Sequence, residues 1–508
     1  MNKNLQTTTG ESIAATSEKM NQWTVMIYMA ADNNLTEECV YALKEIQRVG
    51  AVEGIDTIAL FDSGARGVKT KIYNFGKNRN GGGGVNAEIE EDGALESVAT
   101  PFSVSTPVTL SGKTVSRKSE RAADPEVLKG FLKKGVEEHQ AERFLVVLSG
   151  HGSGAVGDFL KGDNPPSSLS IHELADALKT VKRKIKGGKI HILGMDSCLM
   201  SMAEVCAELA DSTNLMVGAE GFELNTGWPY QRILEALKLE VSRKAAVDPE
   251  ELARIIVKTY IRYYQDYEVA GVSVDHAACD LRKFGEVIGA VGILAEMLIP
   301  KVEEQEVQNA ILLAHWRAQS YKNEQYVDLW DFCDLLEEGC DNQGVKAACK
   351  QVKEAVKSVV IMSRYHGAAF QHSHGLSIFF PWRGVERRVR NAEQKSPEEK
   401  PDDLTAYKSL EFHKKTKWGD FLGAYLDKTR REMRGEPRDK SKAQEPDNNN
   451  AKPVCIVPTD ESRLVVREGP PMDRGEGRGA GSMKNPPVCF IPGSWGKEND
   501  EAIPLGAA

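Results

Sequence analysis

The sequence predicts an α/β protein, a three-layer sandwich in which helices cover both faces of a mainly parallel sheet. Two features of the first half of the chain support this class. Short apolar runs of strand length alternate with segments whose apolar residues recur at helical spacing. The runs are apolar at nearly every position, which is typical of strands buried on both faces, as in parallel sheets.

The first strand–helix–strand unit lies in residues 23–62. Trp23–Ala30 (WTVMIYMA) is the first apolar run, and the polar segment ADNN follows it. Helical spacing then begins at Leu35 and stops at Gly50, a residue type that commonly ends helices. Ile55–Asp62 is the second apolar run. This order predicts two parallel strands joined by a helical crossover.

Residues 77–123 interrupt the alternation. They contain Gly81–Gly84 and a Ser/Thr-rich stretch, so we expect a mobile insertion loop. The alternation resumes at Asp124-Pro125, which predicts a helix with Asp124 as its N-cap and proline in its first turn. Arg143–Gly150 is the third predicted strand.

The same pattern continues through residue 220 and then changes. The remaining predicted elements are a helix at 171–184, a strand at Lys189–Asp196, a helix at Leu199–Ala210, a strand at Leu215–Glu220, a mostly helical region from about 249 to 360, a strand at Gly375–Trp382 and a helix around 404–432.

These patterns divide the chain into four parts. Residues 1–21 are polar and predicted to be disordered, and residues 22–248 form the α/β core. Residues 249–432 form a mostly helical extension that contains the late strand. Residues 433–508 hold ten of the 21 prolines and are predicted to be a disordered tail.

The composition excludes several functional classes. Lys and Arg number 65 against 74 Asp and Glu, a formal charge of −9, which gives no electrostatic basis for nucleic-acid binding. No stretch approaches 18 apolar residues, so no membrane span is predicted. The first residues lack the apolar segment of a secretory signal, and we expect a cytoplasmic protein. Nine cysteines without a CxxC pair indicate reduced thiols and no zinc site.

Two predicted strands end in reactive side chains. One strand leads into Ser149-Gly150-His151-Gly152, and the other leads into Asp196-Ser197-Cys198. In open α/β sheets, sites form at the carboxyl ends of the strands. One loop–helix–strand unit separates these strands, so we expect them to be neighbours with His151 and Cys198 in one crevice.

Histidine beside cysteine is the pairing that nucleophilic catalysis needs, because the imidazole takes the thiol proton. The helix predicted to begin at Leu199 would favour the thiolate of Cys198 through its dipole. The backbone N–H groups of Gly152 and Cys198 are candidates for stabilising the oxyanion of acyl transfer. The alternative for both side chains is a buried thiol and a loop histidine.

Several ordered blocks of the sequence resemble the clostripain-like cysteine peptidases, family C11 of the caspase/legumain clan. The blocks span about residues 22–425, more patchily after 230. Two residues depart from the family pattern, Ala155 in place of Trp and Met195 in place of Phe. The blocks are WTVMIYMAADNNL, DPEVLKGFL, RFLVVLSGHGSG, MDSCLMSMAEV, AEGFELNTGWPY, YVDLWDF and HGLSIFFP.

The resemblance implies a caspase-like sandwich and a catalytic dyad of His151 and Cys198. It also implies cleavage of protein or peptide substrates after a basic residue (P1), Arg before Lys. Asp196 matches the carboxylate that would pair the guanidinium, and its alternative role is to cap a helix. Glu220 and Glu223 are candidates for a second carboxylate. Trp228 and Tyr230 are candidates for a pocket wall, and simple loop packing is their alternative.

No cofactor is expected. Clostripain uses calcium, but this sequence contains no recognisable calcium loop, so calcium rests on the resemblance alone. No metal-binding residues are predicted.

Family members mature by cleavage after a basic residue between the histidine and cysteine blocks. Lys161, in the Gly/Pro-containing segment DFLKGDNPP, is the candidate here, because Lys182–Lys184 lie on a predicted helix.

Two rival interpretations remain. The chain could be an adaptor without catalysis, or a latent peptidase switched on by an intracellular regulator. Cys455 and Cys489 lie in two similar tail segments, KPVCIVP and PPVCFIP, which are either docking motifs or a coincidence of composition.

Overall fold

The computed structural model describes residues 20–64, 70–75, 121–164, 166–266, 271–322, 325–382 and 403–433. All of them belong to one compact unit within Met1–Asp447. The predicted N-terminal segment, the insertion and the tail with Cys455 and Cys489 fall almost entirely outside the described residues.

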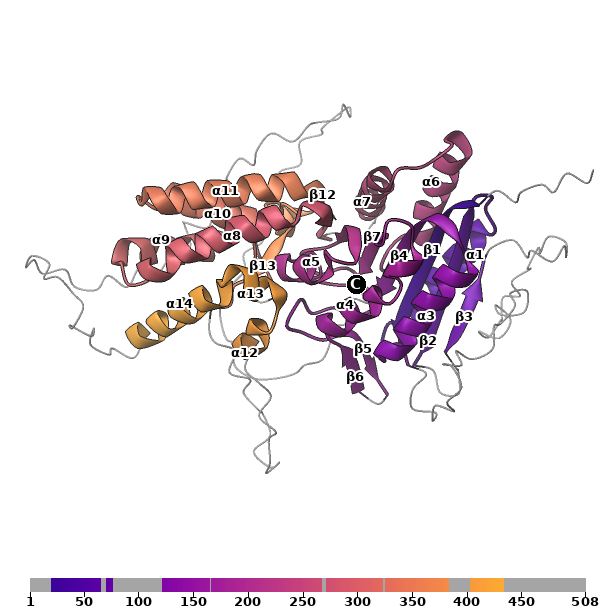
Figure 1. Ribbon diagram of the computed structural model, residues 1–508, viewed down its shortest axis with the longest axis horizontal. Coiled ribbons are helices and arrows are strands. Elements are labelled where there is room, and N and C mark those ends of the chain that lie inside the picture. Colours follow the sequence, from indigo (N-terminus) through magenta and orange to yellow (C-terminus); the bar gives the residue numbers. More distant parts are fainter. Residues whose placement is uncertain are drawn as a thin grey trace, which may run out of the picture. The chain divides into compact units, whose positions relative to one another are not determined.

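The described part of the chain contains an eight-stranded sheet (Figure 1). Strands β8, β7, β4, β1 and β2 are parallel, whereas β3, β9 and β12 pair antiparallel at the two ends. The predicted mainly parallel sheet is therefore confirmed. In sheet order the strands are β12 (Val360–His366), β9 (Val274–Asp280), β8 (Thr213–Gly218), β7 (Ile190–Asp196), β4 (Ala141–Ser149), β1 (Asn21–Ala31), β2 (Ile55–Ser63) and β3 (Lys71–Asn74).

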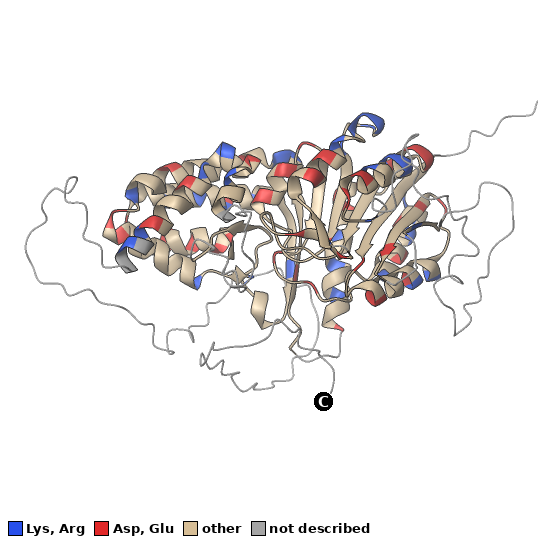
Figure 2. Cartoon of the chain, turned by 90° about the horizontal axis from the view of Figure 1, so that it is seen from below, with Lys and Arg blue, Asp and Glu red and all other residues tan. Residues whose placement is uncertain are grey.

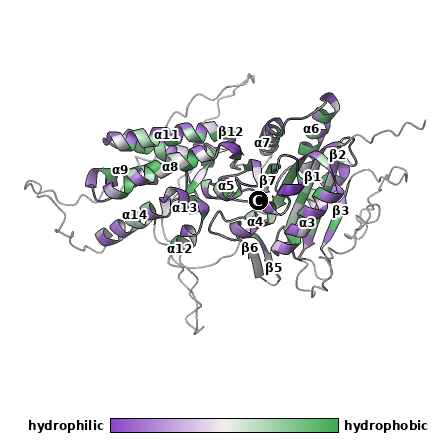
Figure 3. Ribbon diagram, viewed as in Figure 1, coloured by the Kyte–Doolittle hydropathy of each residue, from purple (hydrophilic) through white to green (hydrophobic). Residues whose placement is uncertain are grey.

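Helices cover both faces of this sheet because its strands are apolar on both sides. Odd-numbered residues of β1 from Trp23 to Met29 pack in one core, and even-numbered residues from Met26 to Ala30 pack in the other. Figure 3 shows the resulting green strands between helices with purple outer faces. One face carries α1 (Thr36–Val49), α6 (Tyr230–Arg243) and α7 (Pro249–Gln265), and the other carries α3 (Pro125–Glu138), α4 (Ile171–Lys179) and α5 (Ala203–Leu209).

Local sequence explains where several helices begin. The Asp124 side chain accepts a hydrogen bond from the Glu126 N–H, as predicted for an N-cap. Ser170 and Glu173 form a capping box at the start of α4. That helix ends at Lys179, earlier than predicted, and Lys182–Lys184 form a separate 3₁₀ turn, η1.

The boundary expected at residue 248 does not divide the sheet. Strands β9 and β12 lie beyond it in the chain, yet β9 pairs with β8, and β12 pairs with β9. The segment after 248 therefore completes the central sheet as well as supplying helices.

The remaining elements follow β9. The predicted late strand is confirmed as β13, shorter than expected, in a small sheet of order β10-β11-β13. The single helix expected around 404–432 is three helices, and Lys417 adopts a left-handed conformation between the last two. These elements are η2 (Leu281–Lys283), α8 (Gly285–Leu298), η3 (Ile299–Lys301), α9 (Gln305–Arg317), β10 (Ser320–Tyr321), β11 (Tyr326–Asp328), α10 (Leu329–Gly339), α11 (Gln343–Val359), η4 (Ala368–Phe370), β13 (Ser377–Phe379), α12 (Asp403–Lys408), α13 (Glu411–Thr416) and α14 (Trp418–Met433).

None of the helices in the described ranges is long and apolar enough to cross a membrane. Figure 2 shows acidic and basic residues interspersed along the helices.

A hairpin of β5 (Phe159–Asp163) and β6 (Pro166–Leu169) lies between β4 and α4. Lys161 lies on β5, so the expectation that it occupies a loop is wrong. The register of the hairpin shifts between Phe159 and Gly162, so Lys161 lies at an irregularity of this strand.

Candidate active site

The histidine and cysteine segments begin at neighbouring strand ends. Strands β4 and β7 pair in parallel with Ser149 opposite Asp196, and the Gly150 N–H donates to the Asp196 carbonyl (3.1 Å). The predicted adjacency of the two strands is confirmed. It brings His151 and Cys198 to the same edge of the sheet.

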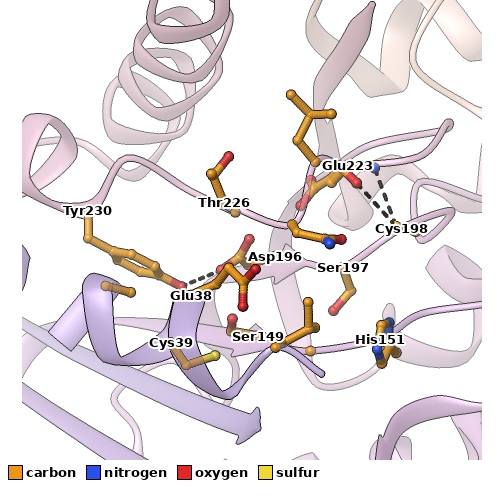
Figure 4. Close-up of a pocket in the computed structure, with 16 residues that line it drawn as sticks. Glu38, Cys39, Ser149, His151, Asp196, Ser197, Cys198, Glu223, Thr226 and Tyr230 are labelled. Atoms are coloured by element: carbon orange, nitrogen blue, oxygen red, sulfur yellow. Dashed lines mark hydrogen bonds between the residues drawn. The ribbon is translucent and has the colours of Figure 1, made fainter. Parts of the chain in front are cut away.

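A cavity lies at this edge (Figure 4). Helix α1, the two strand ends and the loop after β8 form its walls. The side chains relevant to chemistry in its lining are Glu38, Cys39, Ser149, His151, Asp196, Ser197, Cys198, Glu223, Thr226 and Tyr230.

The Cys198 thiol is held by the backbone of Glu223. The Glu223 N–H donates to Sγ (3.3 Å), and the thiol lies 3.6 Å from the Glu223 carbonyl oxygen that it donates to. Burial, and then the Glu223 carboxyl, raise the pKa of the Cys198 thiol to about 12. Cys198 therefore rests as a thiol in this conformation.

The expected help from a helix dipole is absent. Helix α5 begins at Ala203, and the residues from Leu199 to Met202 separate it from Cys198. Leu199 has φ of 64°, which is incompatible with a helix starting there. The prediction of a helix over Leu199–Ala210 that activates the thiol is thus wrong.

His151 Nε2–H donates to Oδ1 of Asn34 (2.6 Å). Burial lowers the pKa of His151, while the charge of Asp163 raises it and that of Lys161 lowers it. The imidazole is therefore neutral near pH 7. Sequence reasoning did not select Asn34, although its loop follows β1, which neighbours β4 and ends at the same sheet edge.

Gly152 allows the two strand-end loops to touch. A Cβ atom at this position would lie 2.4 Å from the carbonyl oxygen of Cys198, and no other residue type avoids this contact. The structure therefore places the Gly152 and Cys198 backbones together. Their predicted role towards an oxyanion stays a prediction.

Asp196 lies in the cavity lining and is almost fully buried. Its Oδ1 accepts the Trp228 N–H (3.0 Å), and its Oδ2 accepts the Tyr230 hydroxyl (2.7 Å). Burial still raises the pKa of Asp196 despite these hydrogen bonds. Helix capping, the alternative role, does not apply, because the N-cap position of α5 is Met202.

Glu223 is the second carboxyl of the cavity. Burial, and next the charge of Asp196, raise its pKa well above the usual range. His276 Nε2 lies 3.5 Å from its Oε1, but burial lowers the pKa of His276 to about 3, so this histidine supplies no charge. Two adjacent buried carboxyls resist double ionisation, so the charge of each opposes ionisation of the other.

Two predicted pocket residues lie elsewhere. Glu220 is fully buried outside the cavity, where its Oε2 accepts the Gly375 N–H (2.6 Å) and its own N–H donates to Asp275. The Trp228 indole packs in the core against Gly194. Trp228 supports the site from behind, because its backbone N–H bonds Asp196 and its side chain acts on Glu223. The cavity-wall position belongs instead to Tyr230.

Lys161 lies close to the site through its backbone. Its carbonyl accepts the Asn33 Nδ2–H (2.7 Å), and its half-exposed side chain lies 3.8 Å from Asp163. The chain segment predicted for processing is therefore attached to the loop that holds His151.

No group of three or more His, Cys, Asp or Glu side chains in the described ranges could hold a metal ion.

Comparison with known proteins gives one family and several distant relatives. The sequence model of the clostripain family, Peptidase C11, matches residues 27–425. Clostripain of Hathewaya histolytica is 22% identical over 316 residues, 53% of this chain and 59% of clostripain. The aligned region therefore covers less than two thirds of that relative.

Two solved structures share the fold. A secreted C11 cysteine protease of Bacteroides thetaiotaomicron, solved with an irreversible peptide inhibitor, has a TM-score of 0.54 at 16% identity. An inactive zymogen C11 protease of Parabacteroides distasonis has a TM-score of 0.53 at 17% identity. Each match covers 78% of this chain and 99% of the other. These similarities confirm the predicted caspase-like sandwich.

Proposed function

The chain belongs to the clostripain family, and from this premise we propose that it is a cysteine endopeptidase that cleaves after Arg and, less readily, after Lys. The observation that carries the proposal is the shared cavity. Cys198 and His151 line it together with two buried carboxyls, Asp196 and Glu223. A nucleophile, a base and an anionic subsite are the three parts that this reaction needs.

In the proposed reaction His151 removes the Cys198 proton as the sulfur attacks the carbonyl carbon of the P1 residue. The N–H groups of Gly152 and Cys198 donate to the oxyanion that forms. The C–N bond then breaks, and His151 gives its proton to the leaving amine. Water, deprotonated by His151, hydrolyses the thioester and restores the thiol.

The carboxyl pair supports the preference for Arg. A guanidinium brings a permanent positive charge and two parallel N–H donors, so its binding would favour the ionised forms of Asp196 and Glu223. The Lys ammonium presents a single point charge and fits a planar carboxylate less well. Because the pair is buried, an uncharged P1 side chain gains nothing from it.

The raised pKa of Cys198 supports a regulated enzyme. A thiol with a pKa of about 12 is a poor nucleophile at neutral pH, so we propose that the described conformation is a latent state. Cleavage at Lys161 or binding of an intracellular partner would convert this latent state into the active one. One structural neighbour is itself described as an inactive zymogen.

Reporter cleavage tests the activity. We expect hydrolysis of an Arg aminocoumarin amide, weaker hydrolysis of the Lys amide and none of the Leu amide. Cys198→Ala should reduce the Arg rate to background while its circular dichroism spectrum stays unchanged. Full activity of this variant would refute the proposed nucleophile, and equal rates on Arg and Leu would refute the specificity.

Intact-mass spectrometry tests self-processing. Wild type should be cut at the Lys161–Gly162 bond into two fragments, whereas Cys198→Ala and Lys161→Met should remain whole. Fragmentation of Cys198→Ala at the same bond would attribute the cut to another protease. Wild type that is active yet uncleaved would leave partner binding as the activation route.

A further inference from the structure

The loop between β1 and α1 connects the catalytic histidine to the hairpin that contains Lys161. Asn33 is anchored at three points: its Nδ2 donates to the Ala30 and Lys161 carbonyls (3.1 and 2.7 Å), and its Oδ1 accepts the Leu35 N–H (2.9 Å). Asn34, the next residue, bonds His151.

Asp32, the first residue of the loop, is also held by several contacts. This buried carboxylate accepts the Asn164 backbone and side-chain N–H groups and pairs with Arg121. Its carbonyl also accepts the Asp163 N–H (2.8 Å). The backbone on both sides of Asn34 is thus held, although Asn34 itself is exposed.

The contact between Asn34 and His151 determines which imidazole nitrogen carries the proton. A carboxamide oxygen only accepts hydrogen bonds, so Nε2 of the neutral ring is protonated. The other nitrogen, Nδ1, is then free of a proton and able to receive one from a thiol. Fixing a tautomer through the far nitrogen is how histidine bases are usually oriented.

We propose that Asn34 is a positioning residue, which acts through His151 by holding the imidazole in the Nε2–H tautomer and in the orientation that serves Cys198. The proposal rests on the proposed peptidase function. Because Asn33 bonds the Lys161 carbonyl, the conformation of the hairpin also reaches His151 through this loop. Sequence motifs gave no sign of this role.

Three variants test the proposal: Asn34→Ala, Asn34→Asp and, as a matched control, Asn309→Ala on the exposed face of α9. For Asn34→Ala we expect kcat on the Arg reporter to fall about tenfold with KM changed less than twofold. Asn34→Asp keeps the acceptor and adds a negative charge. It should restore kcat above pH 7.5 and shift the acidic limb of kcat/KM upward by about one pH unit.

A second measurement does not depend on peptidase activity. The 10 histidines can be labelled with ¹³C at Cε1, and the His151 signal is identified by its loss in His151→Gln. Titration by NMR should show a higher pKa of His151 in Asn34→Asp and a lower one in Asn34→Ala, with Asn309→Ala equal to wild type.

The outcomes separate the two proposals. Wild-type kcat in Asn34→Ala, an Asn34→Asp variant as impaired as Asn34→Ala, or an unchanged pKa of His151 in both would each overturn the role of Asn34. A chain that cleaves no reporter but shows both pKa shifts would refute the peptidase assignment and leave the Asn34–His151 contact established.

Discussion

Cys198 and His151 both rest uncharged, because burial outweighs the charges around them, including that of Asp163 near His151. Glu223 lies beside the thiol, and the charge of its carboxylate opposes formation of the thiolate. The cavity is therefore arranged to attract a cation while opposing the thiolate. Binding of a basic P1 side chain would relieve that opposition, since it neutralises the carboxyls.

Alkylation kinetics test the resting state of the thiol. Below its pKa the thiolate fraction rises tenfold per pH unit, so iodoacetamide should modify Cys198 with a rate that climbs steadily from pH 7 to 10. Mass spectrometry of the Cys198 peptide at timed intervals measures this rate. Glu223→Gln should speed the reaction at the pH values where the wild-type Glu223 carboxyl is ionised. A rate that levels off below pH 8 would show an already activated thiol.

The acidic subsite is tested by Asp196→Asn. Removing one partner of a buried charged contact costs about 2–5 kcal/mol, so kcat/KM on the Arg reporter should fall at least 30-fold. Asp176→Asn, on the exposed face of α4, is the matched control and should match wild type. Equal Arg turnover in Asp196→Asn and wild type, with both folded, would show that Asp196 does not determine the preference for Arg.

Apolar runs located the strand ends, and these place His151, Cys198 and Asp196 at one edge of the sheet, as the structure has them. Sequence reasoning missed Asn34, whose position depends on the loop that follows β1. It also grouped Glu220 with Glu223, although only Glu223 lines the cavity, and Glu220 bonds Asp275 and Gly375 instead. Sequence proximity did not indicate side-chain direction there.

Among the elements, α5 shows how tertiary contacts override local pattern. The residues from Leu199 have helical spacing, yet the Ser201 N–H donates to the Ala219 carbonyl and the Ser201 carbonyl accepts the Ser377 N–H. These bonds tie the segment to the loop after β8 and to β13 in extended form. The helix then begins at Ala203 and is buried along its whole length.

Glu204 on α5 joins three elements, which makes it a test of their attachment. Its Oε1 accepts the Phe379 N–H of β13 (3.0 Å) and the Tyr407 hydroxyl of α12 (2.8 Å). Burial raises the pKa of Glu204 from 4.5 to about 7. The folded chain therefore keeps this proton to higher pH than the unfolded chain, and stability declines as pH rises from 4.5 to 7.

Glu204→Gln removes this dependence, because glutamine stays neutral. Relative to wild type, the variant should gain up to about 3 kcal/mol between pH 4.5 and 8. Urea unfolding at pH 5 and pH 8 measures the difference. Glu286→Gln, an exposed carboxyl on α8, is the control. A stability difference that is the same at both pH values would show that Glu204 is ionised in the folded chain.

For the whole molecule, local sequence pattern did not show that the central sheet continues beyond residue 248. Strand β9 is short and follows a long helix, and local pattern cannot reveal that it pairs with β8. Its partner β12 comes from about 80 residues further along the chain, after four helices. Such pairings depend on non-local geometry, and we expect the core and the extension to fold as one unit.

Truncation tests this unit directly. A chain ending at residue 248 lacks α7, β9 and β12, which leaves the edge of β8 and the apolar face beneath α7 exposed, and we expect it to be insoluble or to unfold without a cooperative transition. A chain ending at residue 433 keeps every described element and should unfold cooperatively, as judged by circular dichroism in urea. Comparing the reporter turnover of this shortened chain with that of the full chain also tests inhibition by the tail. Equal rates would show that the tail does not inhibit. Cooperative unfolding of the chain that ends at 248 would restore the independent core that the sequence pattern predicts, because only a separately stable sheet could fold without its last two strands.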